Sequence, residues 1–511
     1  MNLRKGQIVE LKIFGMAFGG RGIGKYAVAE GDHSPSPRAL AVFVDRAMPG
    51  DTVKASFTKI KSNFAEADLV EIVEPSPDRV KPKCKYAFVC GGCPLQCLKY
   101  EKQLEIKKQH TVDALERIGK IEKPNVLEIA PCKVYKPDEK VDDSARAPFY
   151  FRNKMEFSFG YDDKMKFCLG LHMPGRRFDI LDLEECHLES KLSAEIVNFV
   201  RGFCEKRGWI PFKYSIGEGF LKNLYIREGK RTNEVMVVLG TSDDTPMDFD
   251  EDKKEFVEEL LKFNNTRERS ECATIIKPSC EAGLHNEKFG PQKITSIYWA
   301  ETIAKKGTPK RVEDHLLYGK KTLTEKLILK NGDELDFEIL PQAFFQVNTF
   351  QAEILYNFVV DFATEENNEV IFDLFCGTGT IGLFLAKHAE KVLGIELNED
   401  AVKVARDNAA QNKIFNIDFF TGDTLKMLNT VKERPSLVVV DPPRAGLTEK
   451  IIHKINMFGP RKIIYVSCNP ATMARDINWL GAYGYFLKKV QPVDMFPHSY
   501  HIENVCLIER P

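Results

Sequence analysis

Two residues near the end of the chain have the chemistry needed for covalent catalysis. Cys468 follows the apolar run KIIYVS and is surrounded by polar residues, Ser-Cys-Asn-Pro. A cysteine after an apolar strand is often a small core residue, but these polar neighbours favour a reactive thiol. Glu503 comes after His498 and His501, just ahead of another apolar run. A carboxylate there is unusual in a core unless it is paired or functional, so it is a candidate proton acceptor.

A glycine-rich turn provides a candidate nucleotide site. The apolar run VIFDLF leads into CGTGTIG, which places glycines at 377, 379 and 382. Glycine lets backbone amides approach a ligand, and the following helix N-terminus adds positive potential. Glu396 ends the next apolar run, 17 residues after Gly379, and could accept both ribose hydroxyls. This pattern suits either NAD or S-adenosylmethionine. Asp423, after the third run, could bind an adenine amino group or cap a helix.

A proline pair favours S-adenosylmethionine over NAD. The fourth apolar run, SLVVV, ends in Asp441-Pro442-Pro443, and the two prolines stiffen the turn. The turn leaves carbonyls and the carboxylate of Asp441 at the ligand-binding edge. Dehydrogenases do not need this feature, whereas methyltransferases that act on planar nitrogen heterocycles often carry it. Cys468 lies one strand further along, which also favours a catalytic thiol.

Closely spaced cysteines form a second candidate site. Cys84, Cys90 and Cys93 lie close enough in sequence for three thiolates to reach one centre. Zinc is the alternative occupant, since a Cys-x2-Cys pair also suits tetrahedral zinc. The chain has 13 cysteines, an odd number that argues against a disulfide framework. The Cys-x3-Cys-x2-Cys order of radical enzymes is absent, which favours a structural role over a redox-catalytic one.

Three kinds of segment are expected to position these residues. Residues 1–75 contain short alternating runs and glycine-rich turns, which predict a five-stranded barrel of OB-like shape. Residues 76–342 predict an α+β domain that includes a helix near 98–118, which could pack on the catalytic domain. Residues 343–511 alternate apolar runs with helical segments, as in a doubly wound α/β sheet. No apolar run reaches about 18 residues, and the start lacks a signal peptide, so we expect a cytoplasmic protein.

Several of these motifs together resemble the RNA 5-methyluridine (uracil-C5) methyltransferases. The resemblance rests on FFQVN (344–348), DLFCGTGTIGL (373–383), VVDPPRAGL (439–447), YVSCNPAT (465–472) and VDMFPHSYHIENV (493–505). It implies a Rossmann-like class I methyltransferase domain with a seven-stranded sheet. Residues 1–75 resemble the family's TRAM RNA-binding barrel, and 83–97 resemble its iron–sulfur segment. Both features point to the RlmD-like enzymes of 23S ribosomal RNA more than to the transfer-RNA branch.

The resemblance also implies a role for each site residue. Cys468 would add to C6 of the uracil, and Glu503 would remove the C5 proton, helped by burial that raises its pKa. Asp441 would orient the pyrimidine or the cofactor. A [4Fe–4S] cluster would be held by Cys84, Cys90, Cys93 and Cys186, although Cys97 stands where the family commonly has histidine. The residues implied to bind S-adenosylmethionine are Gln346, Phe375, Gly377, Gly379, Thr380, Glu396, Asp423 and Asp441.

The charge distribution is compatible with an RNA substrate. The whole chain has 73 Lys and Arg against 74 Asp and Glu, but its first 110 residues have 18 against 12. Basic and aromatic residues alternate in KIKSNF (59–64) and RVKPKCKY (79–86), and FYFRNKMEF (149–157) adds Arg152 and Lys154. We expect a monomer that takes a single-stranded or flipped uridine. The alternatives are a transfer-RNA enzyme, an amino-group RNA methyltransferase, and a non-enzymatic RNA assembly factor.

Overall fold

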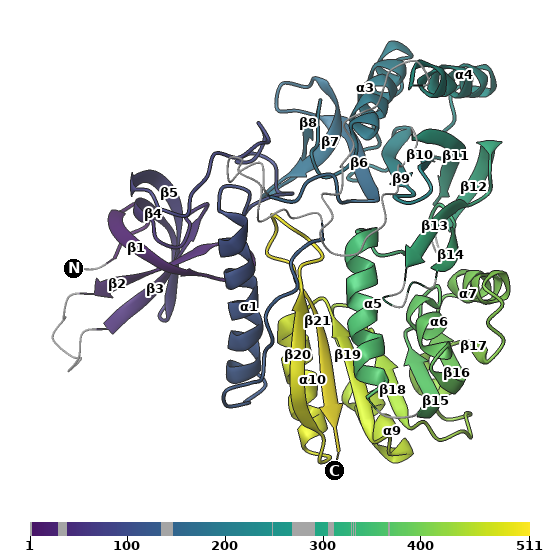
Figure 1. Cartoon of the computed structure of the whole chain (residues 1–511). Helices are drawn as coiled ribbons and strands as arrows, with labels where there is room; N and C mark the ends of the chain where they lie inside the picture. The colour runs from purple at the N-terminus through teal and green to yellow at the C-terminus, as the bar shows by residue number, and fades with distance from the viewer. Residues whose placement is uncertain are drawn as a thin grey trace. The chain divides into compact units, whose positions relative to one another are not determined.

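Figure 1 shows the helices and strands of the computed structural model. The chain divides into two compact units. The structure describes residues 3–28, 38–133, 147–247, 249–267, 292–304, 311–328, 330, 332, 334–365 and 368–510. Unit 1 comprises 1–148, 468–478 and 491–504, and unit 2 comprises 149–467, 479–490 and 505–511. Over the described residues, no helix is both long and apolar enough to cross a membrane.

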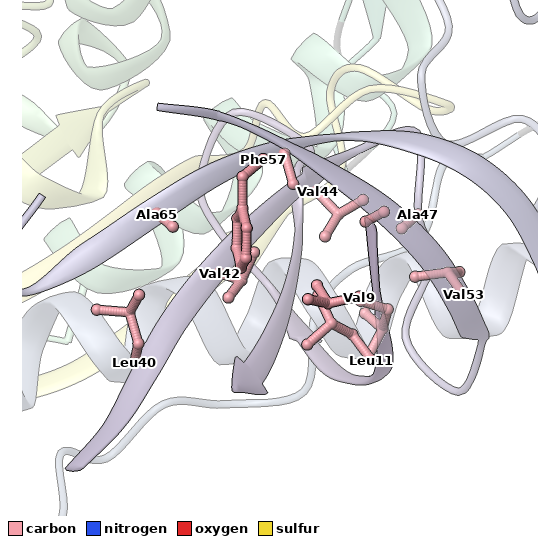
Figure 2. Packing of buried hydrophobic residues seen from close by; sticks show 12 residues of the cluster. Val9, Leu11, Leu40, Val42, Val44, Ala47, Val53, Phe57 and Ala65 are labelled. Carbon is pink, nitrogen blue, oxygen red and sulfur yellow. The ribbon is translucent and has the colours of Figure 1, made fainter. Parts of the chain in front are cut away.

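Unit 1 begins with the barrel that the sequence predicts. Five strands close it in the order β1-β2-β3-β5-β4. Their bounds are Ile8–Met16, Gly22–Val28, Arg38–Asp45, Thr52–Ile60 and Phe64–Glu74. Alternate residues of β1 are buried, because neighbouring side chains of a strand point to opposite faces. Figure 2 shows the resulting core, in which Leu11, Val42 and Phe57 are almost fully buried.

A glycine of the barrel explains part of the Gly-rich stretch at 15–25. A Cβ on Gly22 would lie 2.6 Å from the carbonyl oxygen of Ala47, so no larger residue fits there without a shift. β2 begins at this glycine and continues as a strand rather than a helix. The stretch is therefore a close-packed turn of the barrel and not a phosphate-binding loop.

A buried ion pair fastens the segment after the barrel. The Asp51 carboxylate is fully buried and accepts hydrogen bonds from Arg79 Nε at 2.8 Å and Nη2 at 2.7 Å. It also accepts from the backbone N–H of Ser76 at 2.9 Å. These bonds hold the pKa of Asp51 below its usual value despite its burial. Arg79, which the sequence placed in a basic stretch available to RNA, is thus committed to the fold.

The rest of unit 1 contains helix α1, Tyr100–Arg117, and two segments from the end of the chain. The buried face of α1 combines apolar residues such as Leu115 with the polar residues Gln103, Lys107 and Thr111. The predicted helix near 98–118 is confirmed within two residues at its start.

Unit 2 contains a mixed sheet in the order β12-β11-β10-β9-β6-β7-β8. In that order its strands are Arg311–Gly319, Lys293–Ile303, Glu234–Ser242, Leu221–Glu228, Lys154–Tyr161, Phe167–Met173 and Arg176–Asp182. β13 (Leu323–Ile328) and β14 (Glu334–Ile339) form a separate hairpin. Helix α3 is Lys191–Lys206 and α4 is Phe249–Arg267. The acidic residues Asp250, Glu251 and Asp252 lie in the first turn of α4, where carboxylates favour the helix dipole.

The seven-stranded methyltransferase-type sheet is confirmed, in the order β17-β16-β15-β18-β19-β21-β20. In chain order its strands are Asn368–Leu374, Ala389–Glu396, Ile417–Thr421, Leu437–Val440, Lys462–Ser467, Phe486–Val493 and Glu503–Glu509. Strands β15 to β19 pair in parallel. The helices between them are α6 (Thr380–Ala386), α7 (Glu399–Gln411), α8 (Thr424–Met427), α9 (Glu449–Phe458) and α10 (Pro470–Gly481), with α5 (Thr349–Ala363) ahead of them.

β21 runs against its neighbour β19. The backbone N–H of Arg510 donates to the carbonyl of Arg461 at 3.0 Å, which places the end of β21 beside the start of β19. The two strands are therefore antiparallel, and β21 begins where β19 ends.

Candidate active site

The turn after β15 is shaped for a ligand that approaches the backbone. Phe375, Gly377 and Gly379 have φ angles of 65°, 56° and 80°, so the chain turns sharply before α6 begins at Thr380. A Cβ on Gly379 would lie 2.6 Å from the Phe419 ring, which requires glycine there. A Cβ on Gly377 would meet nothing within 4 Å. One glycine thus serves close packing, and the other leaves open space beside the turn.

Glu396 holds this turn in place. Its Oε2 accepts the backbone N–H of Gly377 at 3.1 Å, and its Oε1 accepts that of Asn398 at 2.9 Å. The carboxylate therefore lies at the ends of β15 and β16 together, where the sequence places it. Asp423 accepts the backbone N–H of Lys426 at 3.0 Å and caps α8. The helix-cap role for Asp423 is therefore observed, while its contact with adenine stays a prediction.

Two carboxyl groups of unit 2 have raised pKa values. Burial, helped by the nearby charges of Asp441 and Glu396, raises the pKa of Asp373 to about 7. Desolvation raises the pKa of Asp441, a half-buried residue after the end of β18, to about 7 as well. Asp373 lies in β15, and within the described residues no hydrogen bond of ordinary geometry reaches its side-chain oxygens, although the nearby Gly382 backbone lowers its pKa. Acids with raised pKa values are frequent in ligand-binding sites.

Asp373 is a residue that the sequence reasoning missed. It was read only as part of the motif DLFCGTGTIGL, although a carboxylate in the apolar run VIFDLF was itself a signal. A Cβ on Gly382 would lie 2.9 Å from its Oδ2, so the third glycine of the motif makes room for this side chain.

Gln346 and Thr380 are buried on the same unit. The backbone carbonyl of Gln346 accepts from Asn153 Nδ2 at 2.8 Å, and the same amide donates to Thr349 Oγ1 at 2.9 Å. The stretch FYFRNKMEF therefore fixes the strand-to-helix turn before α5. Thr380 Oγ1 lies 3.4 Å from Thr378 Oγ1, at the start of α6.

Cys468 and Glu503 both belong to unit 1, and they lie at the same edge of the sheet, after the end of β19 and at the start of β21. Arg461 and Arg510 are paired, and Cys468 and Glu503 each lie seven residues from that pair, along β19 and β21. Continued without a bulge, the register makes Cys468 and Glu503 directly opposite neighbours, whose side chains share a face. Glu503 is 4% exposed, whereas the thiol of Cys468 is half-buried.

The predicted site residues thus fall into two groups. The two proposed catalytic residues, Cys468 and Glu503, lie in unit 1. The predicted cofactor residues all lie in unit 2: Gln346, Phe375, Gly377, Gly379, Thr380, Glu396, Asp423 and Asp441.

The cysteine segment forms a series of tight turns in unit 1. The backbone N–H of Tyr86 points at Cys84 Sγ at 3.4 Å, and that of Gly92 points at Cys90 Sγ at 3.3 Å. Such N–H groups stabilise thiolates bound to metal. Cys93 and Cys84 are half-buried, and Cys97 is buried. Burial raises the pKa of Cys90.

Cys186 lies in unit 2, whereas Cys84, Cys90 and Cys93 lie in unit 1. Among the described residues, the one set of three acidic, histidine or cysteine donors within 4.8 Å of one another is Glu301, Glu313 and His315. The four cysteines predicted to bind a cluster are not in such a set.

The basic stretches differ in how exposed their charges are. Lys59 is exposed, pairs with Glu66 at 3.1 Å and lies 5.9 Å from the Phe64 ring centre. Lys154 lies 5.1 Å from the Tyr225 ring centre, and burial together with a nearby arginine lowers its pKa to about 8. KIKSNF therefore keeps a surface available to a polyanion, whereas Lys154 lies in a less polar setting.

Comparison with known proteins identifies the family. A family model described as tRNA (uracil-5-)-methyltransferase matches residues 309–511. An "uncharacterized RNA methyltransferase" of Caldanaerobacter subterraneus is 34% identical and covers 99% of this chain and 100% of its own length. One from Chlorobaculum tepidum is 35% identical, covering 99% and 97%. The chain belongs to the RNA (uracil-5-)methyltransferases, which use S-adenosylmethionine.

A solved structure matches nearly the whole chain. The tRNA (uracil-54, C5)-methyltransferase of Pyrococcus abyssi, in complex with S-adenosyl-L-homocysteine, has a TM-score of 0.68 and 26% identity. The match covers 98% of this chain and 100% of the P. abyssi chain. The match at this coverage agrees with the methyltransferase fold that the sequence predicts.

Proposed function

We propose that this RNA (uracil-5-)methyltransferase methylates C5 of a specific uridine in 23S ribosomal RNA, with Cys468 as nucleophile and Glu503 as base. The observation that supports the proposal is the antiparallel pairing of β19 and β21, since Cys468 follows the end of β19 and Glu503 begins β21. A nucleophile for C6 and a base for C5 must act on adjacent atoms of one ring, so they must be neighbours.

The reaction follows from the chemistry of these two side chains. The Cys468 thiolate forms an S–C6 bond, and the electrons of the C5–C6 double bond move toward C5 and O4. S-adenosylmethionine supplies a methyl group on a sulfonium, and the C5–methyl bond forms as the sulfonium C–S bond breaks. Glu503 then takes the C5 proton. The electron pair left behind restores the double bond and expels the thiolate from C6.

The residues of unit 2 fit S-adenosylmethionine. The open backbone at Gly377 and the helix start at Thr380 suit the amino-acid end of the cofactor. Glu396 is placed to accept the ribose hydroxyls, and Asp423 the adenine amino group. Asp373 is buried and Asp441 is half-buried beside the same strand ends, where a cationic ligand would favour their charged forms. Gln346 and Phe375 complete the proposed set.

We also propose that Cys84, Cys90, Cys93 and Cys186 hold a [4Fe–4S] cluster. The support is the N–H groups aimed at the sulfurs of Cys84 and Cys90, since such groups stabilise cluster-bound thiolates. Protein purified without oxygen is expected to be brown, to absorb near about 400 nm and to contain about four irons per chain. Colourless protein with one zinc would refute the cluster. The Cys97→Ala variant should stay brown. If this variant is colourless, Cys97 is a ligand of the cluster.

The choice of RNA rests on the N-terminal part of the chain. The closed barrel and cysteine segment resemble those of the ribosomal-RNA branch. A transfer-RNA uridine is the second candidate, because the tRNA (uracil-54, C5)-methyltransferase of P. abyssi matches over 98% of this chain. That coverage also shows that the barrel alone does not separate the two RNA classes. We further propose that the enzyme acts as a monomer in the cytoplasm.

One experiment tests both the reaction and the target. The enzyme is given tritiated S-adenosylmethionine with 23S ribosomal RNA or with transfer RNA, both lacking the modification. Label in ribosomal RNA, mapped by mass spectrometry to 5-methyluridine, is expected. Label only in transfer RNA would mean that the substrate is a transfer RNA and not 23S ribosomal RNA. Label on an exocyclic amino group would make Asp441-Pro442-Pro443 the centre of a different reaction, and no label in either RNA would favour an assembly factor.

A further inference from the structure

Helix α1 carries a row of polar side chains that are fully buried. Gln103, Lys107 and Thr111 are each 0% exposed and lie four residues apart, so they form one stripe along the helix. Burying three polar groups costs free energy unless each finds a partner, and an apolar stripe would pack as well. Their partners therefore show what the stripe is for.

All three residues bind one segment of the chain, 494–504. Gln103 Oε1 accepts the backbone N–H of His498 at 2.9 Å. Lys107 Nζ donates to Asp494 Oδ1 at 2.5 Å and to the Phe496 carbonyl at 2.9 Å. Both charges of the Lys107–Asp494 pair are fully buried.

The third contact lies next to the proposed base. Thr111 Oγ1 donates to Asn504 Oδ1 at 2.9 Å, and Asn504 directly follows Glu503. Asn504 is fully buried, and its Nδ2 has no hydrogen-bond partner within the described part of the chain. The bond from Thr111 thus holds a side chain that has few other polar contacts.

The middle of the segment is held on three sides. His498 has a φ of 66°, a left-handed conformation that a non-glycine residue adopts at a cost. Its carbonyl accepts the backbone N–H of Leu95 at 2.9 Å, and its Nε2 lies 2.7 Å from the carbonyl oxygen of Pro148. Tyr100, at the start of α1, donates to Asp494 Oδ2 at 2.6 Å.

We propose that α1 positions Glu503, with Thr111 and the Lys107–Asp494 pair fixing the register of residues 494–504 along the helix. Hydrogen bonds and ion pairs are directional, so a polar stripe allows one register where an apolar stripe would allow several. This inference rests on the proposed function, because it assigns Glu503 the proton removal that releases the methylated RNA. Thr111, Lys107 and Asp494 are positioning residues in this scheme.

The step most sensitive to the position of Glu503 is the last one. Adding the thiolate to C6 and methylating C5 do not use this carboxylate, whereas breaking the S–C6 bond requires the C5 proton to leave. A displaced Glu503 therefore slows release of the RNA and lets the covalent enzyme–RNA adduct accumulate. A change that only weakened folding would lower methylation and release together.

The test compares Thr111→Val, which has the same shape but lacks the hydroxyl, with Thr111→Ser, which keeps it. For Thr111→Val we expect single-turnover methyl transfer to change less than about twofold, while adduct breakdown slows about tenfold, the effect of about 1.4 kcal/mol. Thr111→Ser should restore breakdown. Thr241→Val is the matched control, since Thr241 is a buried threonine whose Oγ1 accepts from Trp299 at 2.7 Å in unit 2.

A double variant, Lys107→Met with Asp494→Leu, guards against a folding artefact. Replacing both members of a buried ion pair is often tolerated, whereas removing one leaves an unpaired charge. It too should accumulate adduct. If both variants break down adduct at the wild-type rate, or lose transfer and breakdown in parallel, α1 has no positioning role. If Glu503→Gln itself fails to accumulate adduct, the proposed base is wrong, which is a separate result.

Discussion

The segment that carries the proposed base and the turn proposed to bind the cofactor use buried charge in opposite ways. In unit 1, the segment 494–504 is held by polar groups that are buried and partnered, such as the Lys107–Asp494 pair. In unit 2, Asp373 is equally buried, but no hydrogen bond of ordinary geometry from the described part of the chain reaches its carboxylate. Its turn is shaped by glycines instead, one of them beside open space.

This difference separates positioning from binding. Partnered buried charges fix a segment in one place, so their free energy is already used within the protein. A buried carboxyl without such partners keeps a raised pKa and gains most when a cation arrives. Changes in unit 1 should therefore alter rates of bond making and breaking, and changes in unit 2 should alter cofactor affinity.

The largest effect is expected for Cys468→Ala. Removing the thiol should lower methylation of RNA by at least about 10⁴-fold, because no S–C6 bond can form. Binding of S-adenosylhomocysteine, measured by calorimetry, should stay within about twofold. Cys506→Ala, at a fully buried thiol of β21, is the control and should retain activity. Full methylation by Cys468→Ala would end the assignment of the nucleophile.

Glu503→Gln should slow turnover by about 10² to 10⁴ and trap a covalent enzyme–RNA adduct. The amide cannot accept the C5 proton, so the S–C6 bond persists. The adduct is measured as a slower band on a denaturing gel after incubation with RNA and S-adenosylmethionine. Glu509→Gln, at the other end of the same strand, should show no such band. Equal bands from both variants would contradict the role of Glu503.

Glu396→Gln tests the cofactor side. We expect the dissociation constant for S-adenosylhomocysteine to rise about tenfold to a hundredfold, because ribose loses a charged acceptor and the Gly377 N–H loses its carboxylate. At saturating S-adenosylmethionine the rate should recover to within about threefold. Glu390→Gln, near the start of β16, is the control. A lower rate at saturating S-adenosylmethionine, without weaker binding of S-adenosylhomocysteine, would contradict the assignment of Glu396 to cofactor binding.

The last prediction concerns folding stability and its dependence on pH rather than the reaction. The pKa of Asp373 is about 7 in the folded protein and lies near 3.8 when exposed, so the folded state holds this proton more tightly. Asp373 therefore favours folding below about pH 4, and this contribution is lost as pH rises to about 7. In the Asp373→Asn variant, the free energy of unfolding should fall by a few kcal/mol less as pH rises from 4 to 8, as measured by urea denaturation. An unchanged slope would show that the carboxyl ionises freely.

Much of the fold could be predicted because its signals are local. The alternation in 8–16 predicts a barrel strand, and the fully apolar run LVVV at 437–440 predicts a central parallel strand. Cys468 and Glu503 could be singled out because polar neighbours and position set them apart from core residues. Their place at one edge of the sheet depends on the antiparallel pairing of β19 with β21, which no local pattern encodes.

The parts that could not be predicted depend on distant partners. Arg79 was placed in a basic stretch, but its partner Asp51 lies in the barrel, 28 residues earlier. Lys107 is bound to a carboxylate 387 residues away, so nothing near it in sequence reveals its burial.

The pairing of α1 with residues 494–504 has a consequence for how the protein is made. Helix α1 emerges from the ribosome early, whereas its polar partners follow nearly four hundred residues later. β21 then has to insert between β19 and β20, which are both already synthesised. Until that insertion, the buried stripe of α1 lacks its partners and the proposed base lacks its strand. Catalytic competence should therefore appear as a late, slow event of folding, governed by a contact of very long range.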